Sequence, residues 1–142
     1  MSEVIGYAGG TFDLFHTGHV HFLRLCKRQC DKLAVGLNTD EFATRYKRKP
    51  IMNLIERITL VSACKYVDNT FVNYGDEDSR PAILTSQASK VFHGDDWDIE
   101  ALLKQMGFGK DFMHMHGIEV VHIPYTPDIS TTDLIERCRA SQ

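Results

Sequence analysis

VIGYAGGTFDLFHTGH, residues Val4–His19, joins three features that together indicate the fold. The run Val4–Tyr7 predicts a short buried strand. A glycine-bearing loop follows, and mostly apolar residues then recur at helical spacing, at Phe15, His19, Phe22, Leu23, Cys26 and Cys30. The chain therefore opens with a strand, a loop and a helix, which is the first unit of an α/β fold.

The rest of the chain repeats this alternation. Helix-start signatures, a capping residue with an acid close behind it, stand at Asn38–Glu41 and Asn53–Glu56. The repeated order predicts one α/β domain over residues 1–142, with a parallel sheet of about five strands and helices on both faces. Ligands of such sheets bind beyond the carboxyl ends of the strands, so the loops there are the candidates for a site. Runs typical of strands occur at Leu33–Leu37, Thr70–Val72, Lys90–His93 and Glu119–Ile123.

Composition narrows the class of protein. The net charge is only −3, so the chain lacks the basic excess that would indicate nucleic acid as its main partner. No apolar stretch approaches the roughly 20 residues that cross a bilayer, and we expect no membrane insertion. The 4 cysteines form no CxxC pair and no secretory leader precedes them, which predicts reduced thiols and a cytoplasmic protein.

The loop after the first strand has the features of a phosphate site. Gly9 and Gly10 let the backbone approach a phosphate, and the free N–H groups of the following helix favour an anion. His16 and His19 are three residues apart, with Gly18 between them, so both imidazoles can point into one cleft and donate to phosphate oxygens. Two other interpretations stay open at this point. The histidines could be capping or core residues, or zinc ligands, although no cysteine or carboxylate is suitably placed nearby in the sequence.

The segment Gly10–His19, GTFDLFHTGH, resembles the signature of the cytidylyltransferase family, in which the HxGH element binds the triphosphate. Three further segments match in the same order, so the resemblance spans essentially the whole chain and is closest to the glycerol-3-phosphate branch. It implies a Rossmann-like domain in which His16 and His19 act at the α-phosphate. It also implies nucleotide contacts by Gly9, Gly10, Thr11, Phe12 and Gly18.

The second matching segment is the basic run Arg45–Lys49 with the helix that follows it. The resemblance implies that Lys47 binds phosphate from a mobile loop and that Arg57 does so from the helix. A charge on a flexible stem suits a loop that closes over its substrate, and a planar guanidinium suits two phosphate oxygens at once. Taken alone, Arg45–Lys49 is typical of a solvated loop and Arg57 of a surface helix residue.

The third segment, His93–Trp97, resembles the GDDW element of the glycerol-phosphate branch. The resemblance implies nucleotide contacts by Asp95, Asp96 and Trp97. A carboxylate here can accept from a ligand amine or hydroxyl, and the indole can pack over a base or the acceptor. A turn with a half-buried anchor is the alternative interpretation.

The fourth segment, YTPDISTTD at Tyr125–Asp133, leads into the last helix and resembles the RTxGISTT stretch of the family. Tyr125 stands where the family has arginine, and the glycine before Ile129 is missing. The lost guanidinium removes a charge-assisted bond to the triphosphate, unless Arg137, Arg139 or a neighbouring subunit supplies a cation. Ser130 with Asp133 also makes a plausible capping box. The resemblance implies that the triphosphate tail is held by Thr126, Ile129, Ser130 and Thr131.

The four segments together predict an enzyme that transfers CMP from CTP to a small phosphorylated alcohol, glycerol 3-phosphate by resemblance, and releases pyrophosphate. Mg²⁺ bound mainly through the triphosphate is expected, without a metal site in the protein itself. The resemblance also implies a homodimer, in which Lys65–Asp68 is structural or lies at the interface. Two alternatives remain. One is a cytidylyl- or adenylyltransferase for another phosphorylated substrate, and the other is a nucleotide-binding protein of the same fold that has lost the reaction.

Overall fold

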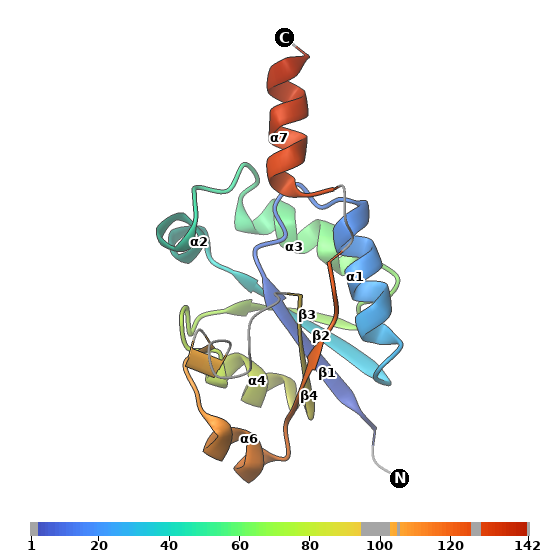
Figure 1. Ribbon diagram of the computed structural model, residues 1–142, viewed down its shortest axis with the longest axis vertical. Helices are drawn as coiled ribbons and strands as arrows, with labels where there is room; N and C mark the ends of the chain where they lie inside the picture. Colours follow the sequence, from blue (N-terminus) through green and yellow to red (C-terminus); the bar gives the residue numbers. More distant parts are fainter. Residues whose placement is uncertain (1–2, 95–102, 105, 126–128, 142) are drawn as a thin grey trace.

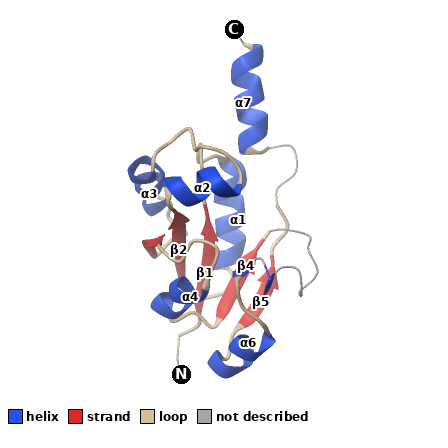
Figure 2. Cartoon of the chain, turned by 90° about the vertical axis from the view of Figure 1, so that its left-hand side faces the viewer, coloured by secondary structure: helices blue, strands red, loops and turns tan. Residues whose placement is uncertain are grey.

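The computed structural model describes residues 3–94, 103–104, 106–125 and 129–141. Five parallel strands form one sheet in the order β3-β2-β1-β4-β5 (Figures 1 and 2). Every strand expected from the sequence is present, which confirms the predicted α/β architecture. The strands are β1 (Ile5–Gly10), β2 (Lys32–Asn38), β3 (Asn69–Asn73), β4 (Lys90–His93) and β5 (Glu119–His122).

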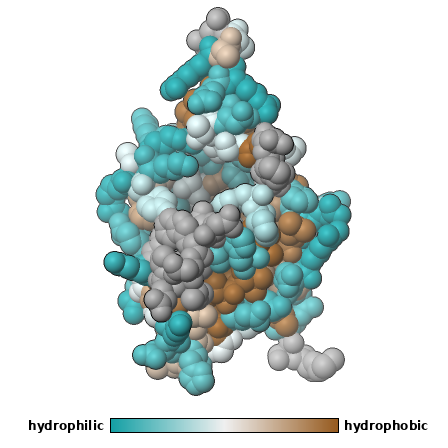
Figure 3. All heavy atoms as spheres, viewed as in Figure 1, coloured by the Kyte–Doolittle hydropathy of each residue, from teal (hydrophilic) through white to brown (hydrophobic). Residues whose placement is uncertain are grey.

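Helices cover both faces of this sheet, as the strand and helix order predicts (Figure 1). The last helix stands beyond the carboxyl ends of the strands, has no buried residue and presents a mainly hydrophilic surface (Figure 3). In the described part of the chain, no helix combines the length and the apolar character of a membrane span. The helices are α1 (Thr17–Lys27), α2 (Asp40–Tyr46), α3 (Leu54–Ser62), α4 (Arg80–Ser86), α6 (Lys110–His116) and α7 (Thr131–Ala140).

Alternating side chains of the strands supply two hydrophobic cores, one on each face. Ala8 of β1 and Phe92 of β4 pack with α1 and α3 on one face. Their sequence neighbours Tyr7 and Val91 pack with α4 on the other face. Because β1 is buried from both sides, it is held rigidly where its carboxyl end meets the loop that leads into α1.

Both predicted helix starts are confirmed, and the cap of α2 lies one residue later than the spacing of Asn38 and Glu41 indicates. Thr39 caps α2 by accepting a hydrogen bond from the N–H of Phe42 (3.1 Å). Asn53 and Glu56 form the reciprocal capping box at the start of α3. These caps fix the first turns of α2 and α3 next to the carboxyl ends of the strands.

The strand order reverses between β1 and β4. From β1 the chain continues to β2 and β3 on one side, and it returns to β4 and β5 on the other. The crevice outside the carboxyl ends at such a reversal is where open α/β sheets bind ligands. The loop from β1 into α1, residues 11–16, lies at this point.

Candidate nucleotide site

His16 and His19 lie face to face at the start of α1. Their ring centroids are 3.8 Å apart and the ring planes are 25° from parallel. The Nδ1 atom of His16 accepts from the N–H of Gly18 (3.0 Å), and the Nδ1 atom of His19 accepts from the N–H of His16 (3.2 Å). The two rings therefore cap the helix and lie against each other, which confirms the capping interpretation and brings the two imidazoles to one location.

These contacts decide where the imidazole protons lie. A neutral ring whose Nδ1 accepts a hydrogen bond carries its proton on Nε2. Burial lowers the pKa of His16. Burial, reinforced by the neighbouring His16 and opposed by Asp13, lowers the pKa of His19 to about 3. Both rings are thus neutral at pH 7, and each has an Nε2–H donor for a phosphate oxygen beside the N–H groups that open α1.

The glycine between the histidines is required by the ring packing. A Cβ at Gly18 would lie 2.8 Å from Cε1 of His16 and 3.0 Å from Cγ2 of Ile129. Gly9 and Gly10 also have packing reasons that the sequence did not predict. A Cβ at Gly9 would clash with the hydroxyl of Tyr7, and one at Gly10 would lie 3.0 Å from the ring of Phe12.

The loop before the histidines holds backbone strain at two side-chain-bearing residues. Phe12 has φ 55° and Leu14 has φ 48°, both in the left-handed region. Such positions cost about 1–3 kcal/mol each and persist only where the surroundings hold them. From the sequence, the glycines are the residues expected to have unusual backbone angles. The residue types Phe and Leu give no indication of a left-handed conformation.

Asp13, between the two strained residues, is the feature that holds the loop. Its carboxylate is only 4% exposed. It accepts from the N–H of Ile51 (2.8 Å) and of Met52 (2.9 Å), and the guanidinium of Arg48 lies 3.4 Å away. The carboxylate therefore fastens the end of the basic segment to the histidine loop. The sequence analysis did not identify Asp13 as a site residue. Its position between Phe12 and Leu14 could have indicated it, because a charged residue flanked by apolar residues in a loop needs partners if it is buried.

The start of α7 returns to the same loop. The hydroxyl of Thr131 donates to the backbone carbonyl of Asp13 (2.9 Å), and Ile129 lies against Gly18. Ser130 caps α7 by accepting from the N–H of Asp133 (3.0 Å), which is one half of the predicted capping box. Ile129, Ser130 and Thr131 are thus brought beside the histidines. The other residues that the sequence assigned to the nucleotide from these segments lie outside the described residues: Asp95, Asp96, Trp97 and Thr126.

Arg57 is fully buried, with 0% exposure. Its Nε donates to the carbonyl of Met52 (3.0 Å), and its Nη2 donates to Oδ1 of Asp40 (2.6 Å). Its Nη1 donates to two carbonyls that follow β1 and end β2, those of Thr11 and Asn38, both at 2.9 Å. The interpretation of Arg57 as a surface helix residue is therefore wrong. The predicted phosphate contact would require the guanidinium to leave carbonyls that have to be satisfied, and in this structure it joins the strand ends to one another.

Lys47 and Arg48 contrast with Arg57. Lys47 ends α2 with an exposed side chain. Arg48 is partly buried and reaches the carboxylate of Asp13 only at 3.4 Å. The basic segment therefore brings one exposed and one loosely held cation to the edge of the histidine loop.

Polar side chains form a ladder across three strand ends. The amide Nδ2 of Asn38 donates to the hydroxyl oxygen of Thr11 (3.1 Å), and Nδ2 of Asn73 donates to Oδ1 of Asn38 (3.3 Å). Because the Thr11 oxygen accepts from Asn38, its own O–H proton can point to another acceptor. The ladder thus orients a hydroxyl next to the histidine loop.

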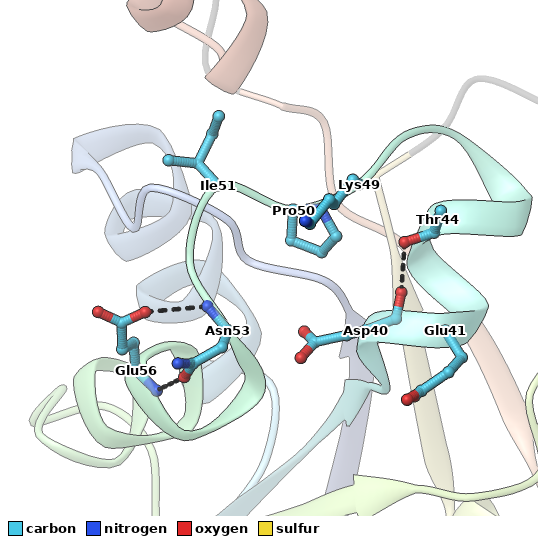
Figure 4. A pocket seen from close by; sticks show the side chains of 8 residues that line it. All are labelled: Asp40, Glu41, Thr44, Lys49, Pro50, Ile51, Asn53 and Glu56. Atoms are coloured by element: carbon cyan, nitrogen blue, oxygen red, sulfur yellow. Dashed lines mark hydrogen bonds between the residues drawn. The ribbon is translucent and has the colours of Figure 1, made fainter.

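A cavity of about 460 Å³ borders the basic segment (Figure 4). It lies between α2 and the start of α3, and its charged lining residues are Asp40, Glu41, Glu56 and Lys49, of which Asp40 is paired with Arg57 and Glu56 caps α3. This lining favours a ligand group with positive charge. Thr44, Pro50, Ile51 and Asn53 complete the lining.

Within residues 3–94, 103–104, 106–125 and 129–141, no three His, Cys, Asp or Glu side chains form a group that could hold a metal ion. The carboxylate of Asp13, whose charge acts on His19, is occupied by backbone N–H groups. Mg²⁺ usually keeps several waters and binds to substrate phosphates with one or two carboxylates. Among the described residues, a magnesium ion at this site would therefore take most of its ligands from a bound triphosphate and water.

Comparison with known proteins decides the family. Residues 7–137 match the family described as cytidylyltransferase-like, which is most of the chain. The chain belongs to this family. Its resemblance to the cytidylyltransferase signature is thereby confirmed, and the matched residues include every segment on which that resemblance was based.

The relatives of this cytidylyltransferase-like chain have different names, and two of the names state different substrates. It is 33% identical over 136 residues to the glycerol-3-phosphate cytidylyltransferase of Bacillus subtilis, covering 96% of each chain. It is 46% identical over 90 residues to the ethanolamine-phosphate cytidylyltransferase of Arabidopsis thaliana, covering 62% of this chain and 21% of that protein. It is 33% identical over 138 residues to the bifunctional protein HldE of Marinomonas, covering 95% of this chain and 28% of that protein. The chain thus spans less than a third of two of these relatives.

Solved structures share the cytidylyltransferase-like fold. The lipopolysaccharide core biosynthesis protein of Thermoplasma volcanium superposes with a TM-score of 0.74 at 24% identity, over 88% of this chain and 99% of that one. Pantothenate synthetase of Thermus thermophilus superposes with a TM-score of 0.63 at 16% identity, over 97% of this chain and 65% of that one. At these identities the likeness concerns the fold alone.

Proposed function

We propose that this protein transfers CMP from CTP to a small phosphorylated alcohol and releases pyrophosphate. The observation that carries the proposal is the stacked pair His16 and His19, whose Nε2–H groups lie beside the opening turn of α1 at the reversal of strand order. In this proposal, three kinds of donor from the loop and the start of α1 bind one phosphate: the two imidazoles, the helix N–H groups and the hydroxyl of Thr11. Membership of the cytidylyltransferase-like family supports the same reaction class.

The chemistry proposed is an in-line displacement. An oxygen of the acceptor's phosphate forms a bond to the α-phosphorus of CTP, and the bond from that phosphorus to the bridging oxygen breaks, so pyrophosphate leaves with the electron pair. A phosphate monoester has a second pKa near 6 and is largely ionised at pH 7, so no general base is needed. Catalysis then consists of positioning and charge stabilisation.

Each part of the site has a role in this scheme. His16 and His19 donate to the non-bridging oxygens of the α-phosphate, where negative charge increases in the transition state. Lys47 and Arg48 offset charge on the phosphates as the basic segment covers the nucleotide. Mg²⁺ carried by the triphosphate would supply further charge neutralisation. Arg57 acts through the carbonyls and the carboxylate that it binds, as a positioning residue.

Glycerol 3-phosphate is the first candidate acceptor, because the glycerol-3-phosphate cytidylyltransferase of Bacillus subtilis matches the chain over 96% of both lengths. A phosphorylated amino alcohol such as phosphoethanolamine is the second candidate. Two observations favour it: the 46% identity to an ethanolamine-phosphate cytidylyltransferase over 90 residues, and the acidic cavity beside Lys49, whose charge suits an ammonium group.

The test is pyrophosphate release measured for CTP and ATP against glycerol 3-phosphate, phosphoethanolamine and a sugar 1-phosphate. We expect release with CTP and one phosphorylated alcohol. Glu41→Gln separates the two acceptors: if the ammonium group occupies the acidic cavity, this exposed substitution raises KM for phosphoethanolamine and leaves KM for glycerol 3-phosphate unchanged. Binding of CTP without pyrophosphate release from any pair would favour a nucleotide-binding protein that has lost the reaction. We also propose a homodimer, which light scattering of the full chain would test.

A further inference from the structure

Tyr125 sits where two elements on either side of the nucleotide crevice support its ring. A Cβ added to Gly94 would clash with Cε1 and Cζ of Tyr125, so the ring face lies against the glycine backbone directly after β4. The ring of Phe22, from α1, is 5.5 Å away between centroids and tilted by 41°. Phe22 and Gly94 are buried, yet Tyr125 is 58% exposed. The ring of Tyr125 therefore packs on Phe22 and Gly94, while much of the residue stays accessible to solvent.

The location relates this ring to the phosphate donors. Phe22 follows His19 by three residues on α1, which is about 4.5 Å along a helix axis. Gly94 follows β4, the strand that pairs with β1 across the reversal of strand order. The ring thus lies on the β4 side of the crevice, roughly one helical turn from the histidines. A nucleotide whose α-phosphate binds His16 and His19 and whose base extends toward the β4 side would bring its base to this ring.

The chemistry of a tyrosine at this place differs from that of the arginine in the motif that Tyr125–Asp133 resembles. A phenol ring carries no positive charge for a phosphate tail, and it offers a flat apolar face instead. Every nucleobase has a face that stacks on such a ring. Of the two arginines of α7, Arg137 is engaged in an ion pair with Asp133 (2.8 Å) on the exposed helix.

We infer that Tyr125 stacks on the nucleobase, so that this chain draws part of its nucleotide affinity from the base where the related motif uses charge on the phosphates. The inference rests on the proposed nucleotide function and adds a specificity-determining residue to it. Removing a stacking aromatic side chain weakens binding by about 5- to 150-fold per base.

The experiment compares two ligands that share a phosphate tail. Calorimetry on the full chain measures Kd for CTP and for inorganic tripolyphosphate, with Mg²⁺, in wild type, Tyr125→Ala and Tyr125→Phe. We expect the alanine variant to lose about 5- to 150-fold in CTP affinity and the phenylalanine variant to stay close to wild type. Tripolyphosphate affinity should be the same in all three. Tyr74→Ala is the matched control, because Tyr74 is 80% exposed and follows β3 at the other side of the sheet.

Two results would overturn the inference while CTP still binds to the wild type. One is an unchanged CTP affinity in Tyr125→Ala. The other is an equal loss for CTP and tripolyphosphate, because a ring that only supports the fold or the tail affects both ligands. No binding of CTP to the wild type would be a different result, since it contradicts the proposed function together with this inference.

Discussion

The carboxylate of Asp13 accepts a hydrogen bond from the backbone N–H of Met52 at 2.9 Å, joining the histidine loop to the end of the basic segment. A second bond, from Ile51, and the hydroxyl of Thr131 on the Asp13 carbonyl make this residue the meeting point of three segments. Each of the three carries residues assigned to the phosphates. The geometry of the site therefore depends on a side chain that need not touch the nucleotide.

Asp13→Asn tests this dependence. The amide places an N–H₂ group opposite a backbone N–H, which leaves a buried donor unsatisfied at a cost of about 1–3 kcal/mol in the free energy of unfolding. We expect kcat to fall by at least tenfold as well, because the segment with Lys47 and Arg48 is no longer fastened to the loop. Urea unfolding and steady-state rates measure the two effects. Asp111→Asn, on the exposed side of α6, is the control, and equal behaviour of both variants would contradict the role of Asp13.

Arg57 and Lys47 should separate stability from turnover. Arg57→Ala removes the donor that binds three carbonyls and the partly exposed carboxylate of Asp40, so we expect a loss of at least about 1–3 kcal/mol in the free energy of unfolding. Lys47→Ala, at an exposed position, should change that free energy by less than about 0.5 kcal/mol and still lower kcat.

Arg57→Lys keeps the charge without the planar fork and serves where the alanine variant does not fold. Denaturant midpoints and rates of the variants give the comparison. An Arg57→Lys protein of wild-type stability but reduced phosphate affinity would show that the arginine binds the ligand directly, against the positioning role argued from its burial.

The stability of the protein should fall in mild acid. The pKa of His19 is about 3 in the folded state, below its ordinary value of 6.5 in the unfolded chain, because burial disfavours the charged ring. Between these values the unfolded state binds more protons, so the free energy of unfolding decreases as the pH falls below about 6.5. His19→Gln should flatten this part of the curve, while His21→Gln, at an exposed position of α1, should leave it unchanged. Thermal melts from pH 7.5 to 4.5 provide the curves, and identical slopes in all three proteins would refute the assignment.

The sequence predicts the sheet of this protein well, because buried parallel strands and capped helices leave local patterns. Lys90–His93 was predicted with the bounds that the structure has, and the capping box of Asn53 and Glu56 is present as expected. These features depend on residues a few positions apart. Helical spacing also relates residues a few positions apart, so it correctly predicts that Phe22 and His19 lie on one side of α1.

The burial of Arg57 and its hydrogen-bond partners could not be predicted in the same way. Its partners are carbonyls of Thr11 and Asn38, which lie 46 and 19 residues away and carry no side-chain signal. Nor does the sequence reveal that Gly9 makes room for Tyr7, or that Phe12 adopts a left-handed conformation. Such properties arise from backbone groups brought together by the fold, and they decide which of the motif residues face a ligand.

We propose that His16 and His19 use their Nε2–H groups on the α-phosphate of the nucleotide. Glutamine places an amide N–H₂ near the position of Nε2, and asparagine reaches only that of Nδ1, so His19→Gln and His19→Asn differ in the donor that matters. The most direct measurement is single-turnover transfer of label from [α-³²P]CTP to the acceptor by wild type and both variants. We predict that label moves to the acceptor, that His19→Asn slows this step by about a hundredfold or more, and that His19→Gln retains more of the rate. Transfer by His19→Asn at the wild-type rate would contradict the account.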